Sequence, residues 1–157
     1  MLSGYYSGSF QATFCSMCSA GKYSHAIATG CSECPAGKAG TVTNATSEES
    51  GCAILCAPGH FSTSSSTICS VCPVNTYAYT FLTGPSCLSC PSSSTSTIRS
   101  INRTNCTCNA GYSGPDGGAC AACNPGQFKP LSGSGACEDC NAGLGQIVLG
   151  GKTAIVT

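Results

Sequence analysis

The sequence predicts a small disulfide-rich fold, an elongated tandem array of short β-ribbons and turns with almost no helix. Sixteen of its 157 residues are cysteines, no residue is tryptophan, and only 8% are charged. Ordering a residue costs about 1–2 kcal/mol of backbone entropy, and the sparse, scattered Leu, Ile, Val and Phe cannot build one sizeable core against that cost. The cysteines form eight close pairs at nearly even intervals, which indicates a repeat array. The pairs are Cys15/Cys18, Cys31/Cys34, Cys52/Cys56, Cys69/Cys72, Cys87/Cys90, Cys106/Cys108, Cys120/Cys123 and Cys137/Cys140.

The cysteines restrain the chain through either disulfides or metal. Cysteine at about 8–10% is typical of disulfide scaffolds, in which each bridge contributes about 2–4 kcal/mol. The spacing from Cys15 to Cys34 would also suit a four-cysteine zinc site. Three glycosylation sequons, the lack of basic and helical segments, and one C-x-C and one C-x3-C pair favour disulfides. We therefore expect no metal, no cofactor and an oxidising extracellular or cell-surface location.

The charge distribution excludes a nucleic-acid partner. Six basic and six acidic residues are dispersed along the chain, whereas phosphate binding needs clustered Lys and Arg. The longest apolar patch is the tail from Ile147 to Val156, interrupted by glycines and a lysine, so we expect no direct membrane insertion. Residues 1–10 do not resemble a signal peptide. If the protein is secreted, we therefore expect this chain to be a mature form or, as we favour, an excerpt of a longer chain.

Each cysteine pair is followed by a cassette of turn residues. Pro, Ala or Asn precedes a Gly or Asn that can adopt positive φ, and an aromatic residue often follows. We expect these aromatic rings to lie over a neighbouring disulfide; exposed strand residues are the alternative. The cassettes begin at Cys18, Cys34, Cys56, Cys72, Cys90, Cys108, Cys123 and Cys140, and their aromatics are Tyr23, Phe61, Tyr77, Tyr112 and Phe128.

Two extracellular module types share these patterns. The segment from Cys106 to Cys120, with Cys108-Asn-Ala-Gly-Tyr at its centre, resembles the C-terminal half of an EGF-like module. The cassette Cys-x-x-Gly-x-Tyr/Phe, followed by Cys-x-x-Cys, resembles ephrin-receptor-like and tumour-necrosis-factor-receptor-like cysteine-rich repeats, which also occur in tandem in protist surface proteins. The resemblance covers Cys15 to Cys140, but no Asp/Asn cluster precedes a cysteine, so it implies no calcium site.

The resemblance also implies a disulfide pairing. In these modules the cysteine before the Gly-aromatic turn bonds to the next cysteine downstream, which gives a ladder and leaves Cys15 and Cys140 to pair outside the segment. Crossed pairing, with Cys15–Cys31 and Cys18–Cys34, would use all sixteen cysteines and stays open. The ladder bonds are Cys18–Cys31, Cys34–Cys52, Cys56–Cys69, Cys72–Cys87, Cys90–Cys106, Cys108–Cys120 and Cys123–Cys137.

The chain divides into three parts. Residues 1–14 form an N-terminal segment, in which Tyr5–Phe14 is a candidate strand. Residues 15–140 form the array, whose repeats we expect to stack end to end into a rod because each is too small to bury a core alone. Residues 141–157 form a C-terminal β-hairpin, predicted over Gln146–Val156, or the start of a following module.

No residue pattern indicates catalysis. His25 and His60 lack a recognisable partner and are predicted to be exposed loop residues. The acidic pairs Glu48-Glu49 and Glu138-Asp139 are predicted to be solvated turn residues, and Gly143-Leu-Gly145 lacks the context for phosphate binding. We expect no enzyme, no catalytic residue and no cofactor-binding residue.

Covalent glycans are the expected modification. The sequons begin at Asn44, Asn102 and Asn105. Asn44 lies in the longest loop between pairs and is the first candidate, whereas early bonding of Cys106 could block Asn102, Asn105 or both. The hydroxyl runs Ser62–Thr67 and Ser92–Thr97 are either flexible loops or O-glycosylated segments.

The sequence thus predicts a structural extracellular glycoprotein rod, part of a cell-surface coat, stalk or filament. A flagellar hair is one concrete possibility. Its partners would be other copies of itself or other surface glycoproteins. The alternative is a receptor or adhesion ectodomain that binds a protein ligand, and the degenerate repeat between Cys87 and Cys106 is where a binding patch would be sought.

Overall fold

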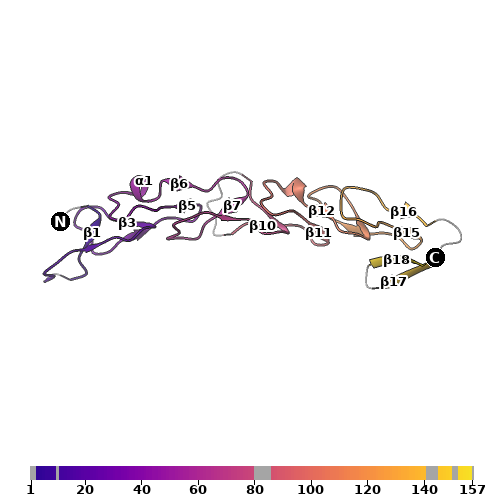
Figure 1. The fold of residues 1–157 in the computed structure, drawn as a ribbon, viewed down its shortest axis with the longest axis horizontal. Coiled ribbons are helices and arrows are strands. Elements are labelled where there is room, and N and C mark those ends of the chain that lie inside the picture. The colour runs from indigo at the N-terminus through magenta and orange to yellow at the C-terminus, as the bar shows by residue number, and fades with distance from the viewer. Residues whose placement is uncertain (1–2, 10, 80–85, 141–144, 150–151, 157) are drawn as a thin grey trace. The chain divides into compact units, whose positions relative to one another are not determined.

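The fold is a series of two-stranded antiparallel hairpins stapled by disulfides, as the computed structural model in Figure 1 shows. The structure describes residues 3–9, 11–79, 86–140, 145–149 and 152–156. Seven disulfides and almost no helix confirm the predicted fold class. The strands are β1 Tyr5–Tyr6, β2 Ser16–Met17, β3 Lys22–Tyr23, β4 Ser32–Glu33, β5 Lys38–Ala39, β6 Ile54–Leu55, β7 His60–Phe61, β8 Ser70–Val71, β9 Thr76–Tyr77, β10 Leu88–Ser89, β11 Ser94–Thr95, β12 Thr107–Cys108, β13 Tyr112–Ser113, β14 Ala121–Ala122, β15 Gln127–Phe128, β16 Glu138–Asp139, β17 Gly145–Leu149 and β18 Lys152–Val156.

Eight of these hairpins share one plan in the described part of the chain. The first strand follows a turn, and the second lies within or overlaps the next cysteine pair, as when Lys22 pairs with Glu33 and Tyr23 with Ser32. We number these repeats in chain order, from the turn residue to the end of the second strand. They cover residues 4–17, 21–33, 37–55, 59–71, 75–89, 93–108, 111–122 and 126–139.

The two ends of the chain differ in how far they match the prediction. At the N-terminal end the strand is only Tyr5–Tyr6, which pairs with β2 to make a hairpin of the same plan as the others. Phe14 lies outside it and is 75% exposed, so the predicted strand over Tyr5–Phe14 is too long. At the C-terminal end β17 pairs antiparallel with β18, as the hairpin prediction expected.

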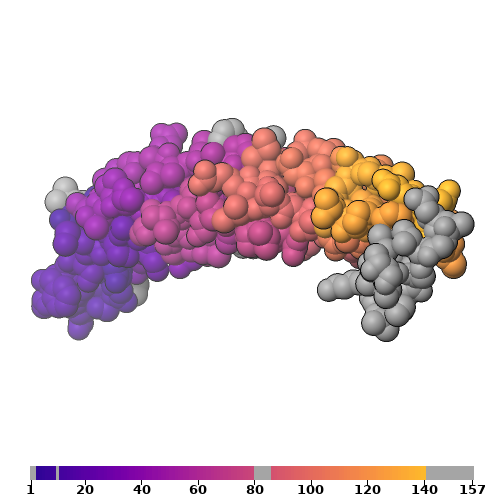
Figure 2. Space-filling model, turned by 45° about the vertical axis from the view of Figure 1, so that its right-hand side comes forward, coloured from indigo at the N-terminus to yellow at the C-terminus, as the bar shows by residue number. Residues whose placement is uncertain are grey.

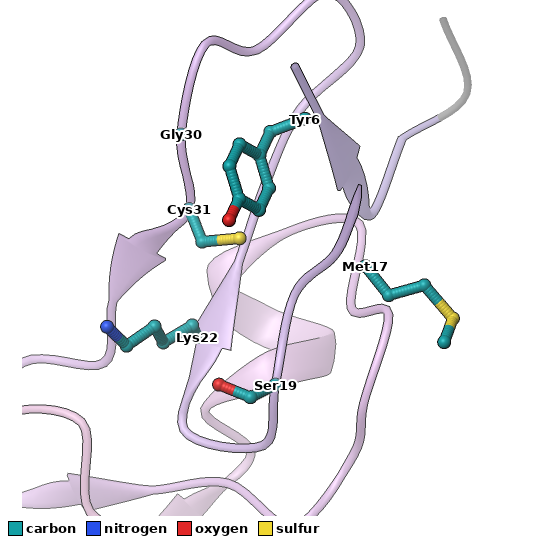
Figure 3. Close-up of a pocket in the computed structure, with 6 residues that line it drawn as sticks. All are labelled: Tyr6, Met17, Ser19, Lys22, Gly30 and Cys31. Atoms are coloured by element: carbon teal, nitrogen blue, oxygen red, sulfur yellow. The ribbon is translucent and has the colours of Figure 1, made fainter. Parts of the chain in front are cut away.

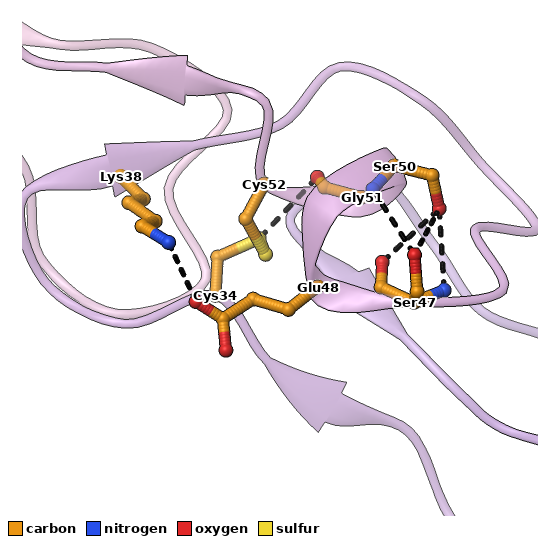
Figure 4. A network of polar contacts seen from close by, with 7 residues as sticks. All are labelled: Cys34, Lys38, Ser47, Glu48, Ser50, Gly51 and Cys52. Carbon is orange, nitrogen blue, oxygen red and sulfur yellow. Dashed lines mark hydrogen bonds and ion pairs between the residues drawn. A yellow bond between two sulfur atoms is a disulfide. The ribbon is translucent and has the colours of Figure 1, made fainter.

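Two short helical turns interrupt the hairpins. The helix α1 spans Glu48–Gly51 and the 3₁₀ turn η1 spans Arg103–Asn105. Ser47 begins α1 as its N-cap and exchanges hydrogen bonds with Ser50 in a capping box (Figure 4). Nowhere in the described residues is a helix long and apolar enough to cross a membrane.

The chain divides into two compact units by its internal contacts. One consists of Met1–Cys72 and Ala78–Cys87, and the other of Pro73–Tyr77 and Leu88–Thr157. Within each unit taken alone, consecutive repeats follow one another in chain order, as the colours of Figure 2 show. The fifth repeat contributes its two strands to the second unit and the segment between them, Ala78–Cys87, to the first.

The buried interior is made of sulfur and small side chains. Among the described residues, the buried apolar set holds no Leu, Ile, Val, Met or Phe. Thirteen large apolar side chains are instead exposed, Ile27 at 79% and Leu131 at 74% among them. Disulfides therefore take the place of an aliphatic core. The buried apolar residues are Cys18, Cys34, Ala39, Ala45, Cys52, Cys56, Cys72, Tyr77, Ala78, Cys106 and Cys108.

The disulfides join the same cysteines as the ladder implied by the resemblance, and none follows the crossed alternative. Each bond links the second cysteine of one pair to the first cysteine of the next, with sequence separations from 12 to 18. The bonds are Cys18–Cys31, Cys34–Cys52, Cys56–Cys69, Cys72–Cys87, Cys90–Cys106, Cys108–Cys120 and Cys123–Cys137. Cys15 and Cys140 are free, Cys15 exposed and Cys140 half-buried.

Candidate functional surfaces at the junctions between repeats

Every repeat begins with a residue in the left-handed region of φ, and in all repeats but the first this residue lies three positions after the second cysteine of a pair. This residue accepts a hydrogen bond that closes its hairpin; for example, the Cys34 N–H donates to Gly21 O at 2.9 Å. Glycine predominates because it has no Cβ to clash at positive φ. The prediction that Gly or Asn supplies positive φ is confirmed in six cassettes; in the Cys90 cassette Ser93 takes this place, and the turn of the Cys140 cassette lies outside the described residues. The turn residues are Gly4, Gly21, Gly37, Gly59, Asn75, Ser93, Gly111 and Gly126.

A second left-handed residue lies six or seven positions further on in six repeats. Its N–H can reach back to the cysteine three positions before the turn of the preceding repeat, as when Asn44 N–H donates to Cys18 O at 2.8 Å and Ser65 N–H to Cys34 O at 3.0 Å. Side chains such as that of Ile27 cost about 1–2 kcal/mol in this conformation. Contacts between repeats, rather than local propensity, therefore impose it. These residues are Ile27, Asn44, Ser65, Arg99, Gly117 and Gly133.

Backbone hydrogen bonds join the turn of one repeat to the next repeat. The Gly4 N–H donates to Ser24 O at 2.9 Å, and the Gly37 N–H donates to Ser62 O at 3.1 Å. The acceptor is always the third residue after the next turn residue, and we call this the junction residue. The same bond runs from Gly59 to Ala78, from Asn75 to Ser96 and from Gly111 to Lys129.

The junction serines return a hydrogen bond to the preceding repeat through their side chains. Ser62 Oγ donates to Lys38 O at 2.9 Å, and Ser96 Oγ donates to Thr76 O at 2.9 Å. Ser24 Oγ donates in the same way to Tyr5 O at 3.2 Å. All three serines are buried, at 2–5% exposure. A buried hydroxyl with a fixed partner makes each junction specific, because losing the partner leaves a polar group unsatisfied.

Two junction residues are glycines because another part of their own repeat approaches closely. A Cβ on Gly40 would lie 1.5 Å from Gly51 O at the end of α1, and one on Gly114 would lie 2.2 Å from Ala119 O. Figure 4 shows the contacts of α1 with Lys38 and with the Cys34–Cys52 disulfide. Lys38 Nζ donates to Glu48 Oε1 at 2.7 Å. Cys34 Sγ lies 3.4 Å from Gly51 O, a packing contact because the bridged sulfur carries no proton.

Lys129 replaces the junction serine in the last of these repeats. Its side chain is 5% exposed, and Nζ donates to Tyr112 O at 2.9 Å, the acceptor that corresponds to Tyr5, Lys38 and Thr76. Nζ also donates to Cys108 O at 3.2 Å and to Gly133 O. All three hydrogens of the ammonium are therefore directed at backbone carbonyls, which compensates for the burial of the charge.

A shallow pocket of about 320 Å³ opens beside the first disulfide. In Figure 3 the Tyr6 ring faces the Cys31 side chain, whereas Met17 points away from both. Tyr6 occupies the aromatic position of its repeat, so this arrangement agrees with the expectation that aromatics lie over a neighbouring disulfide. For the five aromatics named above, that contact stays a prediction; Tyr77 is buried and the others are half-buried.

One carboxyl in the array is electrostatically perturbed. The nearby Ser65 hydroxyl and the ammonium of Lys22, whose Nζ lies 3.4 Å from Glu33 Oε1, lower the pKa of Glu33 from its usual value of 4.5. Ser65 belongs to the fourth repeat and Glu33 to the second. A Cβ on Gly21 would lie 2.3 Å from Ser65 O, so repeats two apart also touch.

The remaining predicted site residues are not brought together. His25 is exposed, but His60 lies half-buried in β7 with Nδ1 3.2 Å from Pro58 O, so describing it as an exposed loop residue was wrong. Glu48 and Glu49 begin α1 and are therefore not turn residues; Glu48 is half-buried and bonds Lys38, whereas Glu49 is exposed. Glu138 and Asp139 are exposed, as predicted, but form β16 instead of a turn. Gly143 lies outside the described residues.

The sequons differ in their surroundings. Asn102 and Asn105 are exposed and form a capping box at η1. Asn44 is half-buried, and its Oδ1 is buried without a hydrogen-bond partner in the described structure. A Cβ on Gly4 would lie 2.3 Å from that oxygen.

The repeat register accounts for the free thiol of Cys15. In the bonded repeats the partner cysteine precedes the turn residue by three positions, as Cys18 precedes Gly21. The position three before Gly4 holds Met1. The bonds span 12–18 positions, and no residue from Lys152 to Thr157 is a cysteine that could serve Cys140 at that spacing. Both thiols therefore lack the usual ladder partner in this sequence.

Sequence reasoning missed the junction residues. Aligning the repeats on their turn residues would have found them, because the third residue after the turn is then small in seven repeats and Lys129 in the eighth. The junction residues are Ser7, Ser24, Gly40, Ser62, Ala78, Ser96, Gly114 and Lys129.

No family model matches the chain, and no curated protein matches it. The structure itself shows a cysteine-rich repeat array with seven disulfides, a content typical of proteins that fold in an oxidising, extracellular compartment.

Proposed function

We propose that the chain is a structural segment of an extracellular glycoprotein, part of a cell-surface coat, stalk or filament such as a flagellar hair. The observation that carries the proposal is the recurring junction. Ser24, Ser62 and Ser96 each donate to the same backbone position of the preceding repeat. The backbone bond of the junction recurs between five pairs of neighbouring repeats, and a contact that recurs in this way suits an array whose task is to extend.

The finer family assignment is part of this proposal. The Gly-turn cassettes and the ladder of bonds support ephrin-receptor-like or tumour-necrosis-factor-receptor-like repeats. The segment from Cys106 to Cys120 supports an EGF-like contribution. Its loop is closed by Cys108–Cys120, the shortest of the seven by separation at 12.

The proposed partners are other copies of the chain or other surface glycoproteins. Cys15 is exposed beside Phe14 and Met17, which are 75% and 62% exposed. A free thiol flanked by apolar side chains suits a covalent contact with a neighbouring molecule better than it suits open solvent.

Surface labelling of intact cells tests the proposal. A membrane-impermeant biotin reagent should label the protein on native cells, and electron microscopy with a specific antibody should place it on a coat, stalk or filament. A matched cytosolic protein should stay unlabelled. Finding the protein only inside the cell, with its cysteines reduced, would contradict the proposal.

A receptor or adhesion ectodomain is the second candidate, and two exposed arginines of the sixth repeat favour it. Arg99 and Arg103 are both exposed in the sixth repeat, and within the described structure neither forms an ion pair. A partner with acidic groups would complement them. Purified protein should then bind cells, and Arg99→Glu with Arg103→Glu should abolish binding, whereas Lys22→Gln should not. Equal binding by both variants would remove this candidate.

A further inference from the structure

The loop between β11 and β12 of the sixth repeat contains five consecutive exposed residues. Every residue from Ile101 to Asn105 is exposed, between buried Ser100 and buried Cys106. Ile98 and Ile101 expose 60% and 54% of their surface. Two aliphatic side chains thus lie open in a loop that also carries two sequons.

The side chain of Asn102 is held with its oxygen occupied. Asn102 Oδ1 accepts a hydrogen bond from Thr104 N–H at 3.2 Å. The Asn102 N–H in turn donates to Asn105 Oδ1 at 2.9 Å. Both bonds of this capping box use the side-chain oxygens of Asn102 and Asn105, and neither uses a side-chain amide nitrogen. A substituent on Asn102 Nδ2 would therefore leave the cap intact, because the oxygen keeps its acceptor lone pairs.

The sequons of Asn105 and Asn44 are less exposed in the folded chain than the sequon of Asn102. Thr104, the hydroxyl residue of the Asn102 sequon, is exposed. Thr107, which serves Asn105, is half-buried in β12, and the residue between them is buried Cys106, bonded to Cys90. Asn44 takes φ of 60° and sits with its Oδ1 buried near Gly4. Asparagine tolerates this left-handed conformation, which accounts for the residue there without a glycan.

We infer that Asn102 is the preferred N-glycosylation site and that its glycan covers the exposed Ile98 and Ile101. The inference rests on the proposed secretory route. In the reaction an N-glycosidic bond forms between Asn102 Nδ2 and the anomeric carbon of the first sugar. The bond from that carbon to a lipid-linked diphosphate breaks, the diphosphate leaves, and Nδ2 loses one proton.

The glycan would also explain a surface so poor in charge. Only 8% of the residues are charged, and the two arginines of this loop have no acidic residue between them. Exposed aliphatic groups on such a surface promote association unless something hydrophilic covers them. A glycan here would also cover the loop that the receptor alternative needs open.

Matched sequon variants test the site. The full chain is secreted from a eukaryotic host behind a supplied signal peptide, and intact mass is measured with and without enzymatic removal of N-glycans. Thr104→Ala removes the Asn102 sequon without touching the Asn102 cap, Thr107→Ala removes that of Asn105, and Thr46→Ala removes that of Asn44. We expect Thr104→Ala to lose a complete glycan mass that the other two variants keep. Binding of a hydrophobic dye should rise in Thr104→Ala only.

Two results would overturn the inference. One is Thr104→Ala keeping the whole glycan mass; the other is secreted wild-type protein with seven disulfides and no N-glycan. Because the signal peptide is supplied, these results are independent of where native cells place the protein. Native cells can lack surface label although the secreted chain carries a glycan at Asn102, which would refute only the proposed function. Native cells can be labelled although Asn102 carries no glycan, which would refute only the inference about Asn102.

Discussion

Lys129→Met should destabilise the junction between the seventh and eighth repeats. The substitution keeps a side chain of similar length and removes a donor to three carbonyls, those of Cys108, Tyr112 and Gly133. Each hydrogen bond from a charged donor is worth about 1.5–3 kcal/mol, and buried carbonyls left without partners add to the loss. The methionine also avoids the cost of burying a charge, several kcal/mol in general, so the contributions partly cancel. We expect a net loss of about 2–4 kcal/mol.

Hydrogen exchange and denaturant unfolding with the disulfides intact measure this loss. The Gly111 and Gly133 amides donate across the junction, to Lys129 O and Cys108 O, and should exchange faster in the variant. Lys129→Ser restores only the hydroxyl found at equivalent junctions and should fall between wild type and Lys129→Met.

The matched control is Lys22→Met, which removes an ion pair of 3.4 Å between half-exposed side chains. Exposed pairs contribute about 0.2–1 kcal/mol, so this control should stay near wild type. If Lys129→Met and Lys22→Met are equally stable, and Gly111 exchanges at the wild-type rate, the buried ammonium does not hold the junction.

Four further predictions follow from the same contacts. Gly40→Ala should destabilise by about 1–3 kcal/mol or more, because its Cβ would meet Gly51 O at 1.5 Å, whereas Gly30→Ala, with nothing within 4 Å, should be neutral in thermal unfolding. Glu33 has a lowered pKa, so the ionised carboxylate stabilises the folded chain above the usual value of 4.5, and this stabilisation is lost as pH falls through the lower pKa of the folded state. Glu33→Gln should therefore flatten that part of a plot of unfolding free energy against pH. An unchanged plot would refute the contacts of Glu33 with Lys22 and Ser65. Reduction should unfold the chain while EDTA leaves its circular dichroism unchanged; unfolding by EDTA, with near sixteen titratable thiols, would restore the zinc alternative. Cys15 and Cys140 should bond outside this segment, so Cys15→Ser should remove covalent species from non-reducing gels of native material, and a peptide map joining Cys15 to Cys31 would contradict the register.

Much of the local structure could be predicted because it is encoded locally. The cassette glycines indicated the first left-handed turn, and the short hairpins followed from the lack of any helical apolar period. The ladder came from the resemblance, not from spacing. The second left-handed turn was not predicted, because Ile27 and Arg99 have no local preference for it and neighbouring repeats impose it.

The missed residues act across repeats. A lysine in a polar loop is normally expected to be solvated, so the sequence around Lys129 does not indicate its burial. Only alignment of the repeats on their turn residues places Lys129 at the junction position. The helix α1 was missed although Ser47 and Ser50 flank the two glutamates, because a single turn has no apolar period to detect. Both features depend on packing that sequence spacing does not describe.

The order of the bridges also determines how the chain would carry tension. A pull along the backbone that reaches Cys18 passes through sulfur to Cys31 and continues to Cys34, and the loop between the bonded cysteines bears none of it. Each of the seven bonds bypasses 12 to 18 positions in this way. Only the two-to-four-residue steps within cysteine pairs remain in the load path between Cys18 and Cys137. Such a segment gains little length before a covalent bond breaks, and reduction would release the stored loops one at a time, at about 3.3–3.6 Å per residue.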